Sequence, residues 1–278
     1  IIPNRGSWLD FEYDAKDLLY FRIDRKRKLP ITTFLYALGY SKKEILETFY
    51  EFKSFNFQED KKLWVTKFDP NDYKRPTKLR NDLINPKDEK IILKKGSKIN
   101  FIIAKKLYDD GLKNIAFKSD YFIGKYVKND FINPSDKEIF LSSGSLINQE
   151  NLNKILELKN FKIEIADVDP VTKGPYLIDT LNVDKNKSKE EAITDIYKVL
   201  RPGEPPSFDV AKEIFTNLFF KSERYDLSEV GRVKLNSKLN LKCNENITIL
   251  RDDDIIAIIK HMLDLKDGKG EVDDIDHL

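Results

Sequence analysis

The residues with chemistry to offer are two acidic clusters, one short basic run and a few isolated titratable side chains. The acidic clusters cover residues 252–254 and 273–276, and carboxylate oxygens are the ligands that Mg²⁺ prefers. The first cluster opens a predicted helix, where carboxylates stabilise the positive end of the helix dipole. It is better explained as a helix start than as a metal site, and we predict no metal site in the chain.

Short motifs that mark common catalytic sites are absent from the sequence. It has no phosphate-binding loop of the Walker type, no glycine-rich dinucleotide fingerprint and no nucleophile elbow. Its one cysteine, Cys243, excludes an internal disulfide and a cysteine-based zinc site, and His261 and His277 are too few for a histidine-rich site. We predict no catalytic residue and no cofactor in this chain, with Cys243 and His261 structural.

The composition limits the kinds of partner. Charged residues make up 35% of the 278 residues, but the formal net charge is only +2, so any nucleic-acid contact must come from local patches. No apolar run reaches the length of about 18 residues that a membrane span needs. The single cysteine favours a reducing, cytoplasmic location. The chain lacks an initiator Met and its last residues complete no element, so we expect a piece of a longer protein.

The elements that must position these residues are readable from local patterns. Runs of β-forming residues at 8–13 and 18–24, separated by a polar turn, predict a hairpin that leads into the basic run. Ser41 to Glu44 and Ser188 to Glu191 have the spacing of capping boxes, and both precede helical apolar patterns. Ser207 is predicted to cap a further helix after a proline-rich break.

An internal repeat occupies the middle of the chain. Residues 81–100 match residues 129–148 at a constant offset, and each copy is predicted to be two strands joined by an Asn-Pro turn. Amphipathic helices are predicted to follow at 102–112 and 152–158. Two copies are too few for a solenoid, so we expect a compact module built on a duplicated β-β-α unit.

The predicted fold class is α+β. We expect a split, mainly helical domain with a β-hairpin, formed by residues 1–49 and 174–278, and an inserted α+β module at residues 50–173. An insertion of this kind requires that its two ends lie close together.

Five stretches together resemble the β subunit of bacterial DNA-directed RNA polymerase, in the same order and at plausible spacing. They are residues 2–12, 22–30, 201–206, 224–232 and 268–278. The resemblance implies an internal piece of β that forms its lobe. The position of the inserted module resembles that of lineage-specific insertions in the lobe, and its repeat resembles β-β′ modules.

The resemblance implies a DNA-contacting role for several residues, each of which also has a structural explanation. Trp8, otherwise a hairpin aromatic, would stack on a base of the non-template strand. Asp276, otherwise in a solvated turn, would accept from an unpaired guanine in a pocket incomplete in this chain. The basic run, otherwise a solvated strand end, would contact phosphates, and the proline-rich stretch, otherwise a stiff linker, would be the gate loop over the DNA channel. The basic run is Arg25, Lys26, Arg27 and Lys28; the gate loop is Arg201, Pro202, Gly203, Glu204, Pro205 and Pro206.

The resemblance also implies an enzyme and partners. The complete polymerase is a nucleotidyltransferase whose Mg²⁺ is bound by another subunit, and this piece alone would be inactive. The expected partners are the remainder of β, the β′ subunit, a sigma factor and DNA. Two alternatives to DNA contact stay open. The chain could bind transcription regulators through residues 50–173, or it could be a purely structural spacer. Arg224, Tyr225, Asp226 and Arg232 are expected to form local scaffolding.

Overall fold

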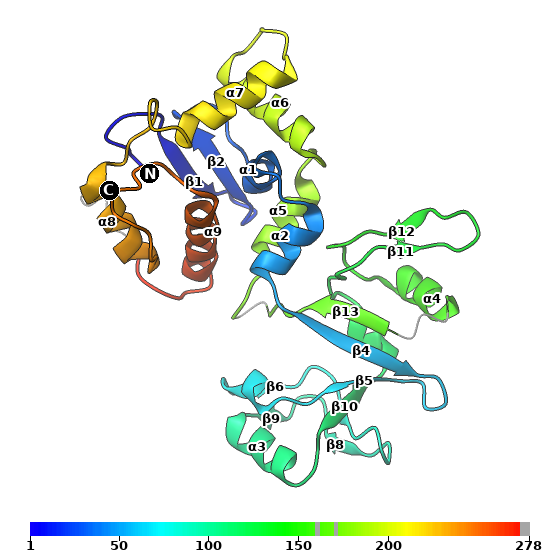
Figure 1. The fold of residues 1–278 in the computed structure, drawn as a ribbon. Helices are drawn as coiled ribbons and strands as arrows, with labels where there is room; N and C mark the ends of the chain where they lie inside the picture. The colour runs from blue at the N-terminus through cyan, green and yellow to red at the C-terminus, as the bar shows by residue number, and fades with distance from the viewer. Residues whose placement is uncertain (159–161, 170–171, 273–278) are drawn as a thin grey trace. The chain divides into compact units, whose positions relative to one another are not determined.

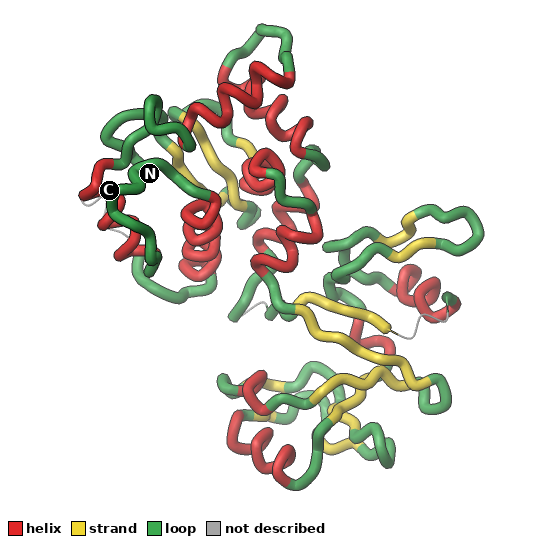
Figure 2. Tube along the Cα trace, viewed as in Figure 1, coloured by secondary structure: helices red, strands yellow, loops and turns green. Residues whose placement is uncertain are grey.

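The computed structural model describes residues 1–158, 162–169 and 172–272, and its chain folds as two compact units. The first unit is Ile1–Tyr50 with Val168–Leu278, and the second is Glu51–Asp167. Figure 2 shows helices dominating the first unit and strands and loops the second. The α+β class and the mainly helical unit with a hairpin are as predicted.

The ends of the second unit are fastened to each other. The backbone N–H of Asp167 donates to the Glu51 carbonyl over 2.8 Å, next to the paired strands that enter and leave the unit. Asp169 and Lys173 pair with one another instead. The second junction therefore lies at 167/168 in the structure, earlier than the end of the insertion predicted at 173.

The first unit packs helices against a three-stranded antiparallel sheet of order β1-β2-β3 (Figure 1). The strands are β1 (Leu9–Tyr13), β2 (Leu19–Ile23) and β3 (Leu29–Pro30); the helices are α1 (Ile31–Leu38), α2 (Lys42–Phe49), α5 (Tyr176–Val183), α6 (Lys189–Leu200), α7 (Phe208–Phe219), α8 (Ser228–Leu239) and α9 (Asp252–Lys266).

Among the described residues, no helix is both long and apolar enough to cross a membrane.

The predicted hairpin is confirmed. β1 and β2 pair in one continuous register from Leu9 opposite Ile23 to Tyr13 opposite Leu19. Alternate β2 residues are buried, as expected for a strand with one face on a core. The basic run begins at the open end of this hairpin, shortly after β2.

The three predicted helix starts follow their local signals to different degrees. The Ser41 side chain accepts from the Glu44 N–H and the Glu44 carboxylate accepts from the Ser41 N–H, which completes the predicted box. Ser188 accepts from the Glu191 N–H over 3.3 Å, but the Glu191 carboxylate accepts from the Lys187 N–H over 2.7 Å, so the box predicted here is only half formed. Ser207 occupies the N-cap position of α7, as predicted, but its side chain makes no capping hydrogen bond. The predicted position is therefore right and the predicted hydrogen bond is wrong.

The second unit is built on a six-stranded sheet of order β13-β4-β5-β10-β7-β8, with two small two-stranded sheets, β11-β12 and β6-β9. Its elements are β4 (Phe52–Gln58), β5 (Leu63–Lys67), η1 (Pro70–Tyr73), β6 (Thr77–Lys78), β7 (Leu83–Ile84), β8 (Ile91–Leu93), β9 (Lys98–Ile99), α3 (Phe101–Asp109), β10 (Asn114–Phe117), η2 (Ser119–Phe122), β11 (Phe131–Ile132), β12 (Ile139–Leu141), α4 (Gln149–Glu157) and β13 (Lys162–Ala166).

The repeat is a structural duplication. Asp82 accepts from the Lys95 N–H and, at the same offset, Asp130 accepts from the Ser143 N–H. Asn100 and Asn148 occupy the N-caps of α3 and α4, and each accepts from the N–H three residues ahead. The two helices begin and end slightly earlier than predicted. The copies differ in their sheets, because β7-β8 joins the large sheet whereas β11-β12 stands apart.

Candidate nucleic-acid interface

The structure brings Trp8 and the basic run together at the open end of the hairpin. The Trp8 N–H donates to the Asp24 carboxylate over 2.8 Å, and the Trp8 carbonyl accepts from the Asp24 N–H over 3.1 Å. Asp24 and Arg25 both have a left-handed backbone, with φ of 48° and 60°, which turns the chain sharply there. The Arg25 guanidinium carbon lies 4.9 Å from the centroid of the half-buried indole, a cation–π pair.

Within the basic run, Lys26 has a structural role. Its ammonium donates to the carbonyl of Leu200 over 2.7 Å, at the end of α6, where helix carbonyls lack partners of their own. The Arg22 guanidinium donates to the Lys26 carbonyl over 3.0 Å. This residue therefore links the basic run to the helix that precedes residues 201–206, and its contact with a phosphate stays a prediction.

The other basic residues of the run differ in how exposed their side chains are. Arg27 is 69% exposed at its side chain and lies 3.7 Å from Asp195, so that pair adds little stability and leaves the cation accessible. Lys28 is half-buried, with its ammonium 4.6 Å from the centroid of the Tyr20 ring. Arg25 and Arg27 are the residues of the run best placed to meet a phosphate.

The predicted gate loop, residues 201–206, is an exposed loop between α6 and α7 that projects beyond the ends of both helices (Figure 1). Gly203 has φ +84° and provides the turn. The Glu204 carboxylate accepts from the Tyr197 hydroxyl over 3.0 Å and lies 3.5 Å from the Arg201 guanidinium. The bond to Glu204 raises the pKa of Tyr197, because ionising the phenol would place two anions in contact. The loop is held in shape by its own Arg201–Glu204 pair and by the bond from Tyr197 of α6.

The segment before Trp8 is fastened to residues that were expected to be scaffolding. Arg5 and Asp226 exchange two backbone hydrogen bonds, of 3.1 and 2.8 Å. Gly6, between Arg5 and Trp8, has φ +127°, and a Cβ there would lie 2.6 Å from Cδ2 of the buried Tyr225. Glycine is therefore required at this position, and Tyr225 fixes the approach of the chain to Trp8.

Arg232 and Asp254 form a buried ion pair, with both side chains fully buried. Two parallel hydrogen bonds of 2.9 Å join the guanidinium to the carboxylate, and Arg232 also donates to the carbonyls of Ile247 and Ile249. Asp254 additionally accepts from the Arg251 N–H at the start of α9. Among the described residues, no group of three or more His, Cys, Asp or Glu side chains could hold a metal ion.

A buried polar cluster links the basic run to the core. The Asp184 carboxylate accepts from the hydroxyls of Thr32 and Thr33 over 2.5 and 2.9 Å. Asn186 bridges Thr33 to Asp195, the partner of Arg27. Burial raises the pKa of Asp184, and the two hydroxyls act in the opposite direction. Nothing in the local sequence marked these residues, because they meet only through the fold.

We expect Thr33→Val to destabilise the protein more at pH 7 than at pH 4. The lost donor served the charged carboxylate, a bond worth about 1.5–3 kcal/mol, so the pKa of Asp184 rises further in the folded state. When the pKa of a carboxyl group is higher in the folded state than in the unfolded state, the protein is most stable at pH values below the unfolded-state pKa. Its stability then falls as the pH rises through the folded-state pKa. Urea unfolding at both pH values measures the difference, and an equal loss at both would contradict the assignment.

Asp276, the predicted guanine contact, lies outside the described residues, so its role stays a prediction. The described part of the candidate interface comprises Trp8, Arg25, Arg27 and the loop 201–206, with Lys26, Asp184 and Gly6 in support.

The family to which these residues belong follows from comparison with known proteins. A family model described as RNA polymerase Rpb2, domain 2, matches residues 1–75 and 134–278. The chain belongs to the RNA polymerase Rpb2 domain 2 family. The matched residues include every described residue of the candidate interface. Residues 76–133, which hold the first copy of the repeat, lie outside the match.

Curated relatives match this chain along its whole length. The DNA-directed RNA polymerase subunit beta of Rickettsia rickettsii (strain Sheila Smith) is 46% identical over 278 residues, which are 100% of this chain and 20% of that protein. The corresponding subunit of Rickettsia felis (strain ATCC VR-1525 / URRWXCal2) is 45% identical over the same coverage. The chain thus spans a fifth of the length of these relatives, and its predicted kinship with the bacterial polymerase β subunit is confirmed.

Proposed function

We propose that this chain serves in transcription as the lobe of the polymerase β subunit and lines the channel through which DNA passes. Its partners would be the remainder of β, the β′ subunit, a sigma factor and DNA. The complete enzyme would join nucleotides with Mg²⁺ held by another subunit, and this chain would contribute DNA contacts without catalysis.

The observation that carries the proposal is the Trp8–Arg25 pair on a turn that is fastened to the base of the loop 201–206. An indole can stack on any base, and guanidinium groups bind phosphate oxygens. Together they suit a single strand that must be bound without regard to sequence. The loop beside them would narrow the route of the DNA.

The proposal is tested by neutralising the two accessible arginines. We expect Arg25→Gln/Arg27→Gln to weaken binding of a single-stranded DNA oligonucleotide, and to flatten the slope of log affinity against log salt by roughly 1.4, because about 0.7 is lost per phosphate contact. Lys16→Gln/Lys43→Gln is the matched control, since it removes two exposed charges of the same unit and Lys16 lies in the turn at the opposite end of the hairpin. An unchanged slope in the arginine variant would refute the proposed contacts.

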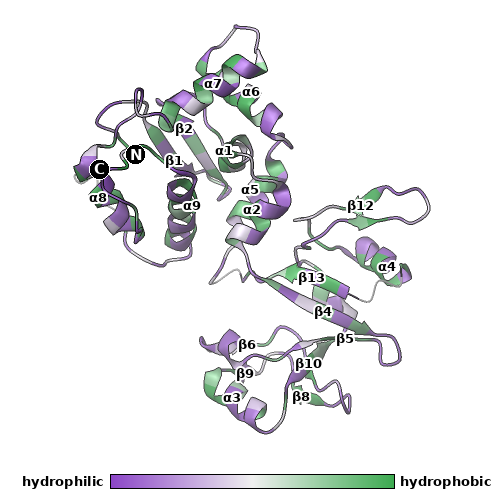
Figure 3. Ribbon diagram, viewed as in Figure 1, coloured by the Kyte–Doolittle hydropathy of each residue, from purple (hydrophilic) through white to green (hydrophobic). Residues whose placement is uncertain are grey.

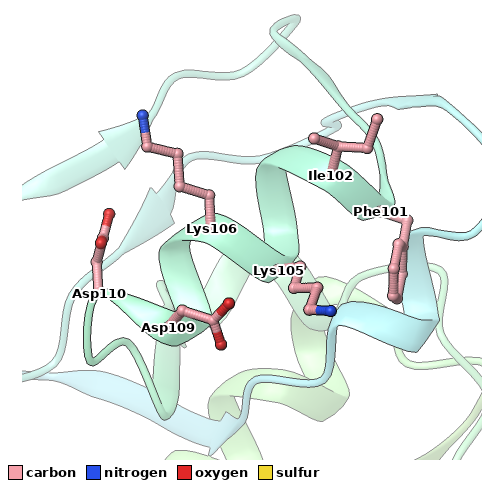
Figure 4. Close-up of a pocket in the computed structure, with 6 residues that line it drawn as sticks. All are labelled: Phe101, Ile102, Lys105, Lys106, Asp109 and Asp110. Carbon is pink, nitrogen blue, oxygen red and sulfur yellow. The ribbon is translucent and has the colours of Figure 1, made fainter.

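The alternative, docking of transcription regulators through the second unit, has weaker support. The described residues contain a shallow hollow on α3, and Ile102 on its rim is 77% exposed (Figure 4). Four of its six lining residues are charged, whereas the centres of protein interfaces are depleted of charge. Deletion of residues 51–167 separates the two functions, because binding of single-stranded DNA should survive it and capture of regulators should not.

A further inference from the structure

The two copies of the repeat share a fold but differ in charge. Residues 74–113 contain twelve lysines and arginines against five acidic residues, a formal charge of +7, and all twelve basic side chains are exposed. Residues 122–161, the same window in the second copy, contain five of each and a formal charge of zero. Because one backbone design accommodates both compositions, the fold does not explain the positive charge of the first copy.

Part of this charge is placed where it opposes folding. Lys78 in β6 lies directly opposite Lys98 in β9, and both are exposed. Like charges in directly opposed positions of an antiparallel pair are destabilising. At the equivalent positions of the second copy, two uncharged residues face each other, Tyr126 and Leu146.

Further cations lie on the turn and the helix next to this strand pair in the chain. The Leu79 N–H donates to the Ser97 carbonyl, and the Leu79 carbonyl accepts from the Gly96 N–H, which places the turn containing Lys94 and Lys95 beside β6. Helix α3 follows directly, and it changes from a hydrophobic first turn to a hydrophilic second half, where Lys105 and Lys106 extend in different directions (Figures 3 and 4). In the described parts of the chain, none of these four lysines, nor Lys78 or Lys98, forms an ion pair. We call the exposed set the basic surface: Lys78, Lys94, Lys95, Lys98, Lys105 and Lys106.

We propose that the basic surface binds the phosphate backbone of double-stranded nucleic acid without sequence specificity. Its cations are spread over a strand pair, a turn and a helix, and neutralising phosphates with such lysines supplies most of the affinity of non-specific binding. Lysine is depleted at protein–protein interfaces, which makes an acidic protein the weaker candidate. The surface goes beyond the proposed function, because it lies on the second unit and between residues 76 and 133, outside the family match.

The test exchanges lysines for the residues that the second copy carries at the same positions. We expect Lys78→Tyr/Lys94→Ser/Lys98→Leu, in the 278-residue chain, to bind a mixed-sequence DNA duplex roughly tenfold or more weakly at low salt, with the salt slope flatter by about 2.7, since about 0.9 is lost per contact. The thermal midpoint should be equal to or higher than that of the wild type, because an opposed like-charge pair is removed. The residues of the proposed single-strand interface are untouched, so failure here leaves that proposal standing.

The matched control is Lys62→Gln/Lys118→Gln/Lys137→Gln, which removes three exposed charges of the second unit outside the basic surface. It should keep the wild-type affinity and slope for the duplex. Equal losses in the two variants, or no loss in the first, would overturn the proposal. So would tighter binding of polyglutamate than of the duplex with the same dependence on the three lysines, because that result assigns the surface to an acidic protein.

Discussion

Replacement of Arg232 by methionine is expected to lower the free energy of unfolding by about 3–5 kcal/mol, because it leaves a buried carboxylate without its main partner. Asp254 is fully buried and receives two 2.9 Å bonds from Arg232. Arg251 still donates to it in the variant, which keeps the loss from being larger. Since whole domains are stable by only about 5–15 kcal/mol, the variant should be partly unfolded at moderate temperature. Denaturant unfolding of the chain measures the change.

Two further variants identify the cause of that loss. Arg224→Met removes an exposed arginine of the same region and should change the stability by less than about 0.5 kcal/mol. Arg232→Met/Asp254→Leu removes the stranded charge and should recover part of the stability, because buried ion pairs are often replaceable by apolar residues. A double variant as unstable as the single one would show that the stranded carboxylate is not the cause.

The second large effect is expected for Gly6→Ala, with a loss of about 1–3 kcal/mol from the strained backbone and a further loss from steric overlap. The new Cβ would lie 2.6 Å from a ring carbon of Tyr225, which is buried and cannot move aside. The displaced segment carries Trp8, so binding of single-stranded DNA should weaken as well. Thermal unfolding and the oligonucleotide titration measure the two consequences.

Gly203→Ala separates overlap from backbone strain. Gly203 also has a positive φ, +84°, but a Cβ there would meet no atom within 4 Å. The loss of stability in Gly203→Ala should therefore come from backbone strain alone and be clearly smaller than the loss in Gly6→Ala. Equal losses in the two variants would mean that the contact with Tyr225 has no energetic consequence.

The features predicted from sequence are those encoded locally. The hairpin, the capping box of α2, the Ser188 cap of α6 and the duplicated unit are all encoded in patterns of a few neighbouring residues, and the structure contains them. The second half of the box predicted for α6 is absent, because Glu191 accepts from the Lys187 N–H instead. The contact of Lys26 with Leu200 and that of Asp184 with Thr33 join residues more than 150 positions apart, for which a local pattern carries no signal. The positive charge of the first copy can be counted in the sequence, but the near-zero net charge of the whole chain conceals it. The structure adds that Lys78 and Lys98 lie directly opposite each other, an arrangement that lowers stability.

The central claim, that this chain stacks a DNA base on Trp8, is tested most directly by titrating a single-stranded oligonucleotide into the wild type, Trp8→Ala and Trp8→Phe. Loss of the indole should weaken binding by about 1–3 kcal/mol, roughly 5- to 150-fold, with Trp8→Phe in between because a smaller ring still stacks. The salt slope should stay unchanged, since stacking neutralises no phosphate. Undetectable binding by the wild type, or equal affinity for all three proteins, would contradict the account.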